Sequence, residues 1–216
     1  AGPGPGRPFL AAANVGVFYH AGTPAIVPDV FVVKNEGEWV VLLNDDGLLA
    51  LRRMGHDAVA ASCAPDLPGA RVRFIDISNR GALEAATEDG LSAIFASPFP
   101  EQPLVVESRV ETQNRAVVAL RVPPDLHCLR GHFRELPVVP GAMQLGWVLR
   151  YATDYLNTQP VLRALKAVKF ERLIQPGHSL QLTITAVAAS ATLLFQFVSL
   201  NGRHASGQLV VGGRDA

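Results

Sequence analysis

One stretch decides how the second half of this 216-residue chain folds: Gly131-His132-Phe133-Arg134-Glu135-Leu136-Pro137-Val138-Val139-Pro140-Gly141-Ala142-Met143-Gln144-Leu145-Gly146-Trp147. It places a histidine in a loop whose freedom Pro137 and Pro140 restrict, because proline fixes φ. Gly141 then allows the backbone to come close to a ligand. An apolar segment follows at once, so the stretch predicts a stiff loop that ends at the N-terminus of a buried helix.

The residues around this loop predict a helix and a set of strands. From 141 to about 157 the apolar residues recur at spacings of three and four, which predicts a helix that is apolar over most of its surface. Strands are predicted at 116–122, 165–172, 179–187, 193–200 and 204–211, and two of them show the two-residue period of a half-buried sheet. Asn201-Gly202 predicts a hairpin turn. A long helix followed by an antiparallel sheet is an α+β arrangement.

The order of these motifs resembles that of the hot-dog 3-hydroxyacyl-[acyl-carrier-protein] dehydratases, and within them the ApeI-like branch. The resemblance covers about 110 residues. It rests on Gly131-His132-Phe133, Pro137 to Gly141, Gln144-Leu145-x-Trp147, Val168-Lys169-Phe170-x-Arg172, Pro176-Gly177 and Ala205-Ser206-Gly207. It implies a hot-dog fold over residues 104–216, in which the sheet wraps a central helix. It also implies a homodimer with acyl sites at its interface and an acidic acyl carrier protein as partner.

The resemblance further implies a dehydration mechanism without metal or cofactor. His132 would remove the C2 proton of a 3-hydroxyacyl thioester, a task that suits imidazole because its pKa is near neutral. The N–H of Gly141, at the helix N-terminus, would stabilise enolate-like charge on the thioester carbonyl. The implied substrate-binding residues are Phe133, Pro137, Val138, Pro140, Met143, Gln144, Trp147 and Phe170. Taken by the apolar pattern alone, Met143, Trp147 and Phe170 fit ordinary core packing better than the lining of an acyl tunnel, because apolar helical stripes are core by default.

Two departures from the family pattern concern the activity. The family loop continues His-Phe-Pro-Gly, whereas this chain has Arg134-Glu135 after Phe133. Fourteen residues after the histidine the family has an acidic residue that protonates the departing hydroxyl, and here that position is Gly146. General acid catalysis contributes about 10²–10⁴-fold to rate. The alternative is therefore a catalytically weakened or non-catalytic module for acyl-thioester binding or dimerisation.

The first half, residues 1–103, predicts a small α/β segment behind a flexible lead at 1–14. Strands are expected at 15–19, 30–33, 39–43, 59–61, 72–77 and 91–96, and helices at 48–54 and 79–87. From Trp39 on, the strands alternate with helices, which favours a small parallel sheet. The proline-rich segment 97–103 predicts a linker, and therefore a domain boundary at 103/104.

Two short motifs in this half resemble metal-dependent enzymes. Pro28-Asp29 before a strand resembles a family of nucleases in which the aspartate binds metal, and Asn44-Asp45-Asp46-Gly47 resembles the opening of SurE-type phosphatases. The alternative for both is a turn, because Asp and Asp-Gly are common turn residues. Without a second ligand cluster or a glycine-rich phosphate loop the turn is the favoured interpretation.

Composition narrows the class of protein. Residues 1–103 carry 7 Lys+Arg and 12 Asp+Glu, a net −5, and residues 104–216 carry 12 and 7, a net +5. A basic second half fits an acidic partner, such as an acidic carrier protein or a nucleic acid, although a moderate surplus of Arg is more often an ordinary solvated surface. Of these partners we expect the carrier protein and no nucleic acid. Only Cys63 and Cys128 are present, no apolar run reaches the ~20 residues that cross a bilayer, and no signal peptide is visible. We expect a cytoplasmic protein without membrane insertion. The missing initial Met indicates an excerpt or a processed form. His127, His178 and His204 are expected to be surface or turn residues.

Overall fold

The computed structural model describes residues 9–10, 31–35, 38–43, 45–63, 71–76, 99–130, 133 and 136–212. The chain divides into two compact units, which we call unit 1 and unit 2. Unit 1 comprises Ala1–Glu101 with Pro123–Pro137, and unit 2 comprises Gln102–Val122 with Val138–Ala216. The segment Pro123–Pro137 thus leaves unit 2 and returns to it. The boundary at 103/104 stays a prediction.

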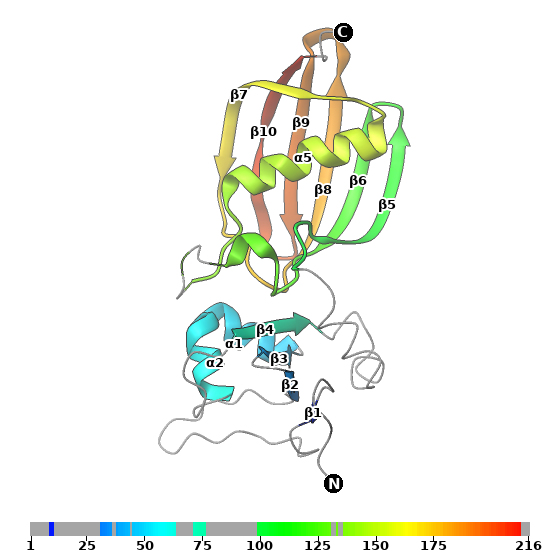
Figure 1. Cartoon of the computed structure of the whole chain (residues 1–216). Coiled ribbons are helices and arrows are strands. Elements are labelled where there is room, and N and C mark those ends of the chain that lie inside the picture. Colours follow the sequence, from blue (N-terminus) through cyan, green and yellow to red (C-terminus); the bar gives the residue numbers. More distant parts are fainter. Residues whose placement is uncertain are drawn as a thin grey trace. The chain divides into compact units, whose positions relative to one another are not determined.

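Unit 2 consists of one helix, α5 (Gly141–Leu156), and a six-stranded antiparallel sheet. In spatial order its strands are β5 (Leu104–Thr112), β6 (Arg115–Arg121), β8 (Ser179–Val187), β9 (Thr192–Ser199), β10 (Gly202–Gly212) and β7 (Val161–Phe170). The helix lies across one face of this sheet (Figure 1). The architecture is α+β with the hot-dog arrangement, which confirms the predicted fold class.

The core of unit 2 follows from the two periodicities of the sequence. Along β8, Leu180, Leu182 and Ile184 are buried, and the residues between them face outward. Trp147 is fully buried on α5 and makes an edge-to-face contact with Phe197 of β9, with ring centroids 6.3 Å apart. Alternate strand residues and every third or fourth helix residue therefore meet in one apolar layer.

A glycine accommodates the bulge between the last two strands. The β7–β10 register shifts between Ser206 and Gln208, and Ala167 on β7 has a left-handed φ of 49°. A Cβ at Gly207 would stand 2.8 Å from the Val168 Cα. The bulge of β7 therefore presses on β10 at a position where only glycine fits without a shift.

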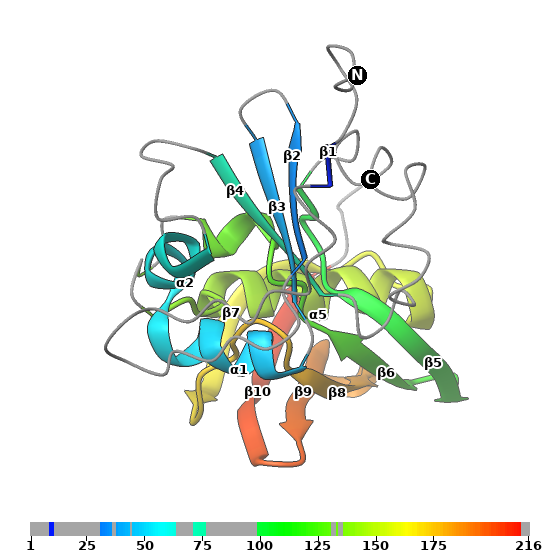
Figure 2. The ribbon, with the colours of Figure 1, turned by 90° about the horizontal axis from the view of Figure 1, so that it is seen from below.

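Unit 1 contains a mixed four-stranded sheet, which Figure 2 shows in the order β4, β3, β2, β1. The strands are β1 (Phe9–Leu10), β2 (Phe31–Asn35), β3 (Glu38–Leu43) and β4 (Arg71–Asp76). Only the β3–β4 pair is parallel, whereas β1–β2 and β2–β3 are antiparallel. A parallel sheet was predicted for the strands from Trp39 on, and β3–β4, the described strand pair of that range, is parallel. Helices α1 (Asp45–Met54) and α2 (His56–Cys63) bury apolar residues against β3 and β4: Val41, Leu43, Leu48, Leu51, Val59 and Phe74.

Three local predictions were wrong. The segment 59–61, predicted as a strand, belongs to α2, because its alanine-rich run has high helix propensity and Gly55, with φ 83°, separates it from α1. Asp45, Asp46 and Gly47, predicted as a turn, form the first turn of α1, where acidic residues favour the helix dipole. Strand β5 was not predicted, because its charged and exposed residues hide the period.

Other predictions fall outside the described residues. They are the strands at 15–19 and 91–96, the helix at 79–87, and Asp29. Within the part of the chain that the structure describes, no helix is both long and apolar enough to cross a membrane.

Candidate active site

The loop before α5 is fixed by backbone and side-chain bonds at Val139. Its N–H donates to the Ile174 carbonyl oxygen at 2.8 Å, and its own carbonyl oxygen accepts a bond from Gln144 Nε2 at 3.2 Å. Pro137, Val138 and Val139 are buried. Besides the restriction by its two prolines, the loop is thus bonded to the β7–β8 connection through the Val139 N–H and to α5 through the Val139 carbonyl oxygen.

The N-terminus of α5 begins directly after this loop. Pro140 is the N-cap residue, and its carbonyl oxygen accepts bonds from the N–H groups of Met143 at 3.0 Å and Gln144 at 3.2 Å. By helix geometry the N–H groups of Gly141 and Ala142 have no acceptor within the helix. They point along the positive end of the helix dipole, which makes this end of α5 suited to an oxyanion.

The Phe170 ring lies over Gly141. A Cβ at position 141 would stand 2.7 Å from the far end of that ring, and Phe170 itself is half exposed at the end of β7. Glycine therefore lets the aromatic ring reach the helix N-terminus. Two of the predicted site residues, Gly141 and Phe170, are brought into contact here.

Gln144 and Trp147 point into unit 2. Both are buried, at 4% and 0% exposure, and the Gln144 amide nitrogen donates its hydrogen bond to the Val139 carbonyl oxygen. Gln144 Oε1 and Trp147 Nε1 have no hydrogen-bond partner among the described residues. Met143 is half-buried on the first turn of the helix. The structure therefore gives Gln144 a role in holding the loop, and gives Trp147 a place in the core.

The remaining predicted residues lie in the loop itself. Phe133 is 62% exposed with a left-handed φ of 56°, and its carbonyl oxygen accepts a bond from the Leu136 N–H at 3.0 Å. His132, Arg134 and Glu135 lie outside the described residues. The role assigned to His132 thus stays a prediction.

Gly146 is exposed on α5 and has open space around it. A Cβ there would meet no atom within 4 Å. It lies on a different face of the helix from Gln144, because neighbouring helix positions are rotated by about 100°. A side chain at this position can therefore leave the helix without its Cβ meeting a neighbouring atom.

The described residues contain no metal cluster and no activated thiol. Burial raises the pKa of the Cys128 thiol to about 11, so it stays protonated at neutral pH. No three His, Cys, Asp or Glu side chains gather at metal distance in the described ranges. Asp45 and Asp46 are exposed on the first turn of α1, away from any such group.

His204 is a buried residue that was wrongly expected at the surface. It is 1% exposed, its Nδ1–H donates to the Leu173 carbonyl oxygen at 2.9 Å, and its Nε2 accepts from the Ser199 hydroxyl at 2.8 Å. Burial lowers its pKa below 6.5, although the bond to Leu173 opposes this. The alternation of β10, which turns Ala205 and Leu209 inward, gave no signal for it because the register shifts next to Ala205.

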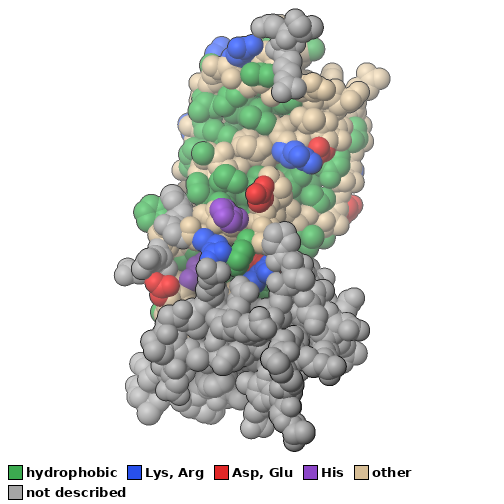
Figure 3. Space-filling view, viewed as in Figure 1, with side chains coloured by type: hydrophobic (Ala, Val, Ile, Leu, Met, Phe, Trp, Pro, Cys, Tyr) green, Lys and Arg blue, Asp and Glu red, His purple; other side chains and the backbone are tan. Residues whose placement is uncertain are grey.

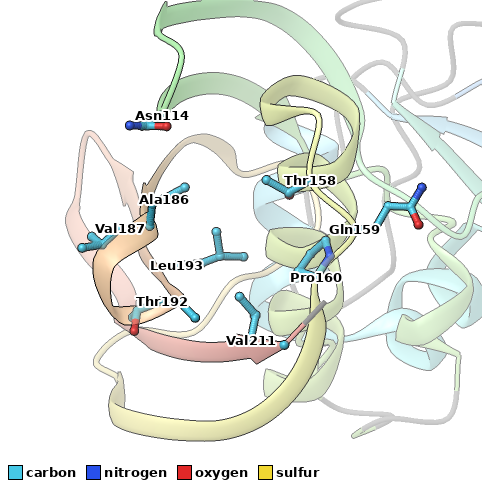
Figure 4. Close-up of a pocket in the computed structure, with 12 residues that line it drawn as sticks. Asn114, Thr158, Gln159, Pro160, Ala186, Val187, Thr192, Leu193 and Val211 are labelled. Atoms are coloured by element: carbon cyan, nitrogen blue, oxygen red, sulfur yellow. The ribbon is translucent and has the colours of Figure 1, made fainter. Parts of the chain in front are cut away.

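A pocket of about 280 Å³ opens at the other end of unit 2 (Figure 4). Its lining is mostly apolar and comes from the segment after α5, the β8–β9 connection and the end of β10: Thr158 to Pro160, Ala186 to Ala188, Ala191 to Leu193, Val211 and Gly212, with Asn114. A helix of 16 residues is ~24 Å long, so this pocket is a full helix length from Gly141. It is not the site at the α5 N-terminus.

Comparison with known proteins gives one consistent result for the second half of the chain. Residues 108–208 match a family model described as ApeI-like, ApeI dehydratase. The FabZ 3-hydroxyacyl-[acyl-carrier-protein] dehydratase of Clostridium acetobutylicum is 34% identical over 95 residues, which cover 39% of this chain and 67% of that enzyme.

Two solved structures each resemble about half of the chain. The dehydratase heterocomplex ApeI:P from Xenorhabdus doucetiae is 28% identical with a TM-score of 0.49, covering 51% of this chain and 97% of the other. An uncharacterised protein from Erwinia carotovora subsp. atroseptica is also 28% identical with a TM-score of 0.49, covering 53% and 99%.

Proposed function

The chain belongs to the hot-dog 3-hydroxyacyl-[acyl-carrier-protein] dehydratase family, and from this premise we propose that it removes water from a 3-hydroxyacyl thioester on an acyl carrier protein. The product is the 2-enoyl thioester. Such a reaction belongs to fatty-acid-like or aryl-polyene-like biosynthesis. The observation that carries this assignment is the Pro-Gly loop, tied at Val139, that delivers Gly141 to the N-terminus of α5.

Two groups of this chain act on the thioester. The thioester carbonyl oxygen accepts a hydrogen bond from the Gly141 N–H, where the helix dipole stabilises the negative charge that develops. His132, nine residues earlier in the loop, takes the C2 proton. Phe170, which covers Gly141, shields the reacting carbonyl from water.

The departing hydroxyl needs a proton that position 146 does not supply. Glycine has no acidic group, and its surroundings are open. The proton then comes from water or from a second subunit. We expect a turnover below that of relatives that carry an acid here, by the ~10²–10⁴-fold that a general acid contributes.

Edge-to-edge dimerisation fits the exposed strand at one side of the sheet. Among the described strands, β7 is the last of the six and pairs with β10 alone. Several of its apolar side chains are exposed: Leu162 at 38%, Leu165 at 51% and Phe170 at 51%. Apolar side chains also spread over the face of unit 2 on which α5 lies (Figure 3). A second copy that pairs at β7 would cover this edge.

An acidic carrier protein is the partner that the charge of the chain favours. The net +5 of residues 104–216 attracts an acidic protein and speeds its encounter.

The test is the absorbance change when 2-enoyl and 3-hydroxyacyl thioesters on a carrier protein interconvert. The native chain should show slow turnover, His132→Ala none, and Gly146→Glu a gain of at least ~10-fold, since open space surrounds position 146 and an acid contributes up to ~10⁴. Gly146→Gln, with the same shape and no acidic proton, is the matched control.

The second candidate is an acyl-binding or dimerisation module without turnover, which the exposed Gly146 favours. It predicts a native chain that binds the acyl carrier protein and converts nothing, while Gly146→Glu becomes active. If neither the native chain nor Gly146→Glu converts or binds the thioester, both candidates are wrong.

A further inference from the structure

His204 is an extra residue on strand β10. Successive residues of β9 pair with Arg203 and Ala205, so the pairing passes over the histidine between them. A bulge of this kind re-aims a side chain. Here the residue is 1% exposed, and its ring lies edge-to-face with the His178 ring, with centroids 5.3 Å apart. The bulge therefore accounts for a buried imidazole in this strand.

Both the backbone and the side chain of His204 bond to the residues that follow β7. The His204 carbonyl oxygen accepts hydrogen bonds from the N–H groups of Glu171 at 2.7 Å and Arg172 at 3.1 Å. Its Nδ1–H donates to the Leu173 carbonyl oxygen at 2.9 Å. One residue of β10 thus holds three consecutive residues of the β7–β8 connection.

The contacts of the ring decide where its proton lies. A carbonyl oxygen can only accept, so Nδ1 carries the proton that bonds Leu173. Burial lowers the pKa of His204, so the ring is neutral at pH 7 and its Nε2 accepts from the Ser199 hydroxyl at 2.8 Å. The Asn201 N–H in turn donates to Ser199 Oγ at 3.0 Å. The β9–β10 hairpin therefore fixes the tautomer and the direction of the ring.

The residues on either side of this held segment, 171–173, both contact the start of α5 or the loop before it. Phe170 comes directly before the segment and places its ring over Gly141. Ile174 comes directly after it, and its carbonyl oxygen accepts the Val139 N–H at 2.8 Å. All these residues belong to unit 2. A displacement of the segment 171–173 therefore reaches Gly141 by two routes, one through each neighbour.

We propose that His204 is a positioning residue: by its bond to Leu173 it fixes the β7–β8 connection, which holds Val139 and Phe170 beside the Gly141 N–H. This role rests on the proposed dehydratase function, and His204 serves it without touching the thioester. The Gly141 N–H acts on charge that develops in the transition state, so its displacement affects turnover more than binding. Since misplacement by about 1 Å can cost ~10²-fold in rate, loss of the Nδ1–H bond should lower kcat at least ~10-fold and leave KM within about twofold.

Two variants at this position separate the Nδ1–H bond from the rest of the side chain. His204→Asn has an amide N–H as many bonds from Cβ as Nδ1 is, so it still donates to Leu173. His204→Gln carries its amide one atom further out, where Nε2 lies, so it keeps a partner for Ser199 and loses the donor to Leu173. Both replace the ring by a neutral amide. Leu193→Ala is the control for a general loss of stability, because it opens a cavity in the core at the other end of unit 2.

The native chain gives the first readout, without any substitution. Nitrogen NMR of the His204 ring at neutral pH should show Nδ1 protonated and Nε2 unprotonated. A ring protonated on Nε2 alone cannot donate to Leu173. That result overturns the proposed role even where a variant fails to fold.

Hydrogen exchange then tests whether the connection is held, independently of activity. The Val139 amide should exchange at least ~10-fold faster in His204→Gln than in the native chain, and within about twofold of the native rate in His204→Asn. The Val211 amide, which bonds to the Ala191 carbonyl oxygen at the other end of unit 2, should not change in either variant.

Kinetics test whether the held connection matters for turnover. In the Gly146→Glu background, His204→Gln should lower kcat at least ~10-fold with KM within about twofold. His204→Asn and Leu193→Ala should both keep kcat within about threefold of their parent, because neither removes the bond to Leu173.

The outcomes separate the two levels of inference. Equal exchange of the Val139 amide in the two His204 variants shows that the Nδ1–H bond does not hold the connection. Faster exchange with unchanged kcat shows that the connection does not position Gly141, and an equal loss of kcat in Leu193→Ala shows a general effect of stability; each overturns the role of His204. If no thioester is converted even with Gly146→Glu, the proposed function fails and the positioning role falls with it, although the tautomer and the exchange rates still decide whether His204 holds the connection.

Discussion

Gly207 and Gly146 have opposite surroundings, and the difference predicts opposite effects of one methyl group. A Cβ at Gly207 meets the Val168 Cα and Cγ2 at 2.8 Å and Phe195 at 3.1 Å, so the backbone of β7 would have to shift. A Cβ at Gly146 meets nothing within 4 Å. The first position is closed by strand pairing and the second is open helix surface.

Gly207→Ala should lower the free energy of unfolding by about 1–3 kcal/mol, as overpacking does. Gly146→Ala should raise it by about 0.5–1 kcal/mol, because alanine has the higher helix propensity in an exposed helix interior. Urea unfolding of both variants followed by circular dichroism measures the difference. Effects of the same sign at both positions would contradict the packing described for Gly207.

His204 gives unit 2 a pH-dependent stability. Burial lowers its pKa below the ordinary 6.5, so between the two values the unfolded chain binds more protons than the folded one. Its contribution is complete above pH 6.5 and decreases as the pH falls through the window below that value. Burial lowers the pKa of His56 in unit 1 as well, so its contribution to stability also decreases as the pH falls.

The measurement is the change of the urea midpoint between pH 8 and pH 5.5. The native chain should lose more stability over this interval than His204→Gln, which has no titrating ring. His127→Gln, at an exposed position, should keep the native slope. A slope that is equal in all three proteins would show that His204 does not titrate in this range.

At the scale of elements, the two edges of the unit 2 sheet are the surfaces where another chain can pair. β7 exposes Leu165 at 51%, and β5 on the opposite edge exposes Val106 at 60%. The proposed dimer uses β7. Leu165 on β7 and Val106 on β5 therefore form a matched pair of positions at which a charge tests which edge is the interface.

Leu165→Lys should shift the chain from dimer to monomer, because a lysine at a paired edge loses hydration on burial. Val106→Lys should leave the mass unchanged. Light scattering after size-exclusion chromatography measures both, with circular dichroism to show retained sheet. Dissociation by Val106→Lys alone would place the interface on β5 instead.

Much of unit 2 could be predicted from sequence because its elements follow clear periods. Helix α5 and strand β8 were predicted within one residue, since apolar side chains recur along them at 3.6 and 2 residues. β5 escaped because Glu107, Arg109 and Glu111 line an exposed edge. The short apolar run of α2 fits a strand and a helix equally well, and only its packing decides.

The features of the site that follow from backbone chemistry could be predicted from the sequence, whereas the directions in which its side chains point could not. Pro140 predicts a stiff loop, and Gly141 predicts that another group can come close to the backbone. The contact of the Phe170 ring with Gly141 agrees with both predictions. The inward turn of Gln144 has no signature in the sequence, because its neighbours on the helix are apolar on several faces. In unit 1, the buried ion pair between Arg73 and Asp125 joins residues that are 52 positions apart in the sequence, so no local pattern indicates it.

At the scale of the whole molecule, each unit has its own core but the chain passes between them. Helix α5 packs on β6, β7 and β8, whose residues all follow 104, whereas the segment Pro123–Pro137 belongs to unit 1. The hot-dog sheet should therefore fold without the first half, and the turn at 123–130 should not keep its structure. The two tryptophans allow a direct test, since Trp147 is the one that remains after residue 103.

A chain of residues 104–216 should keep the blue-shifted emission of a buried indole and unfold cooperatively in urea, because Trp147 is fully buried among residues of unit 2. Its Leu126, Leu129 and Arg130 amides should exchange freely, because the shorter chain lacks three residues that contact this turn. Arg73 pairs with Asp125, the Phe99 ring lies under the Arg130 guanidinium group, and the Pro100 carbonyl oxygen accepts a bond from the His127 N–H. The full chain with Trp39→Phe is the matched reference with the same single fluorophore. A red-shifted emission in the shorter chain would mean that unit 2 needs unit 1 to fold, and protected amides at 126–130 would mean that the turn holds itself.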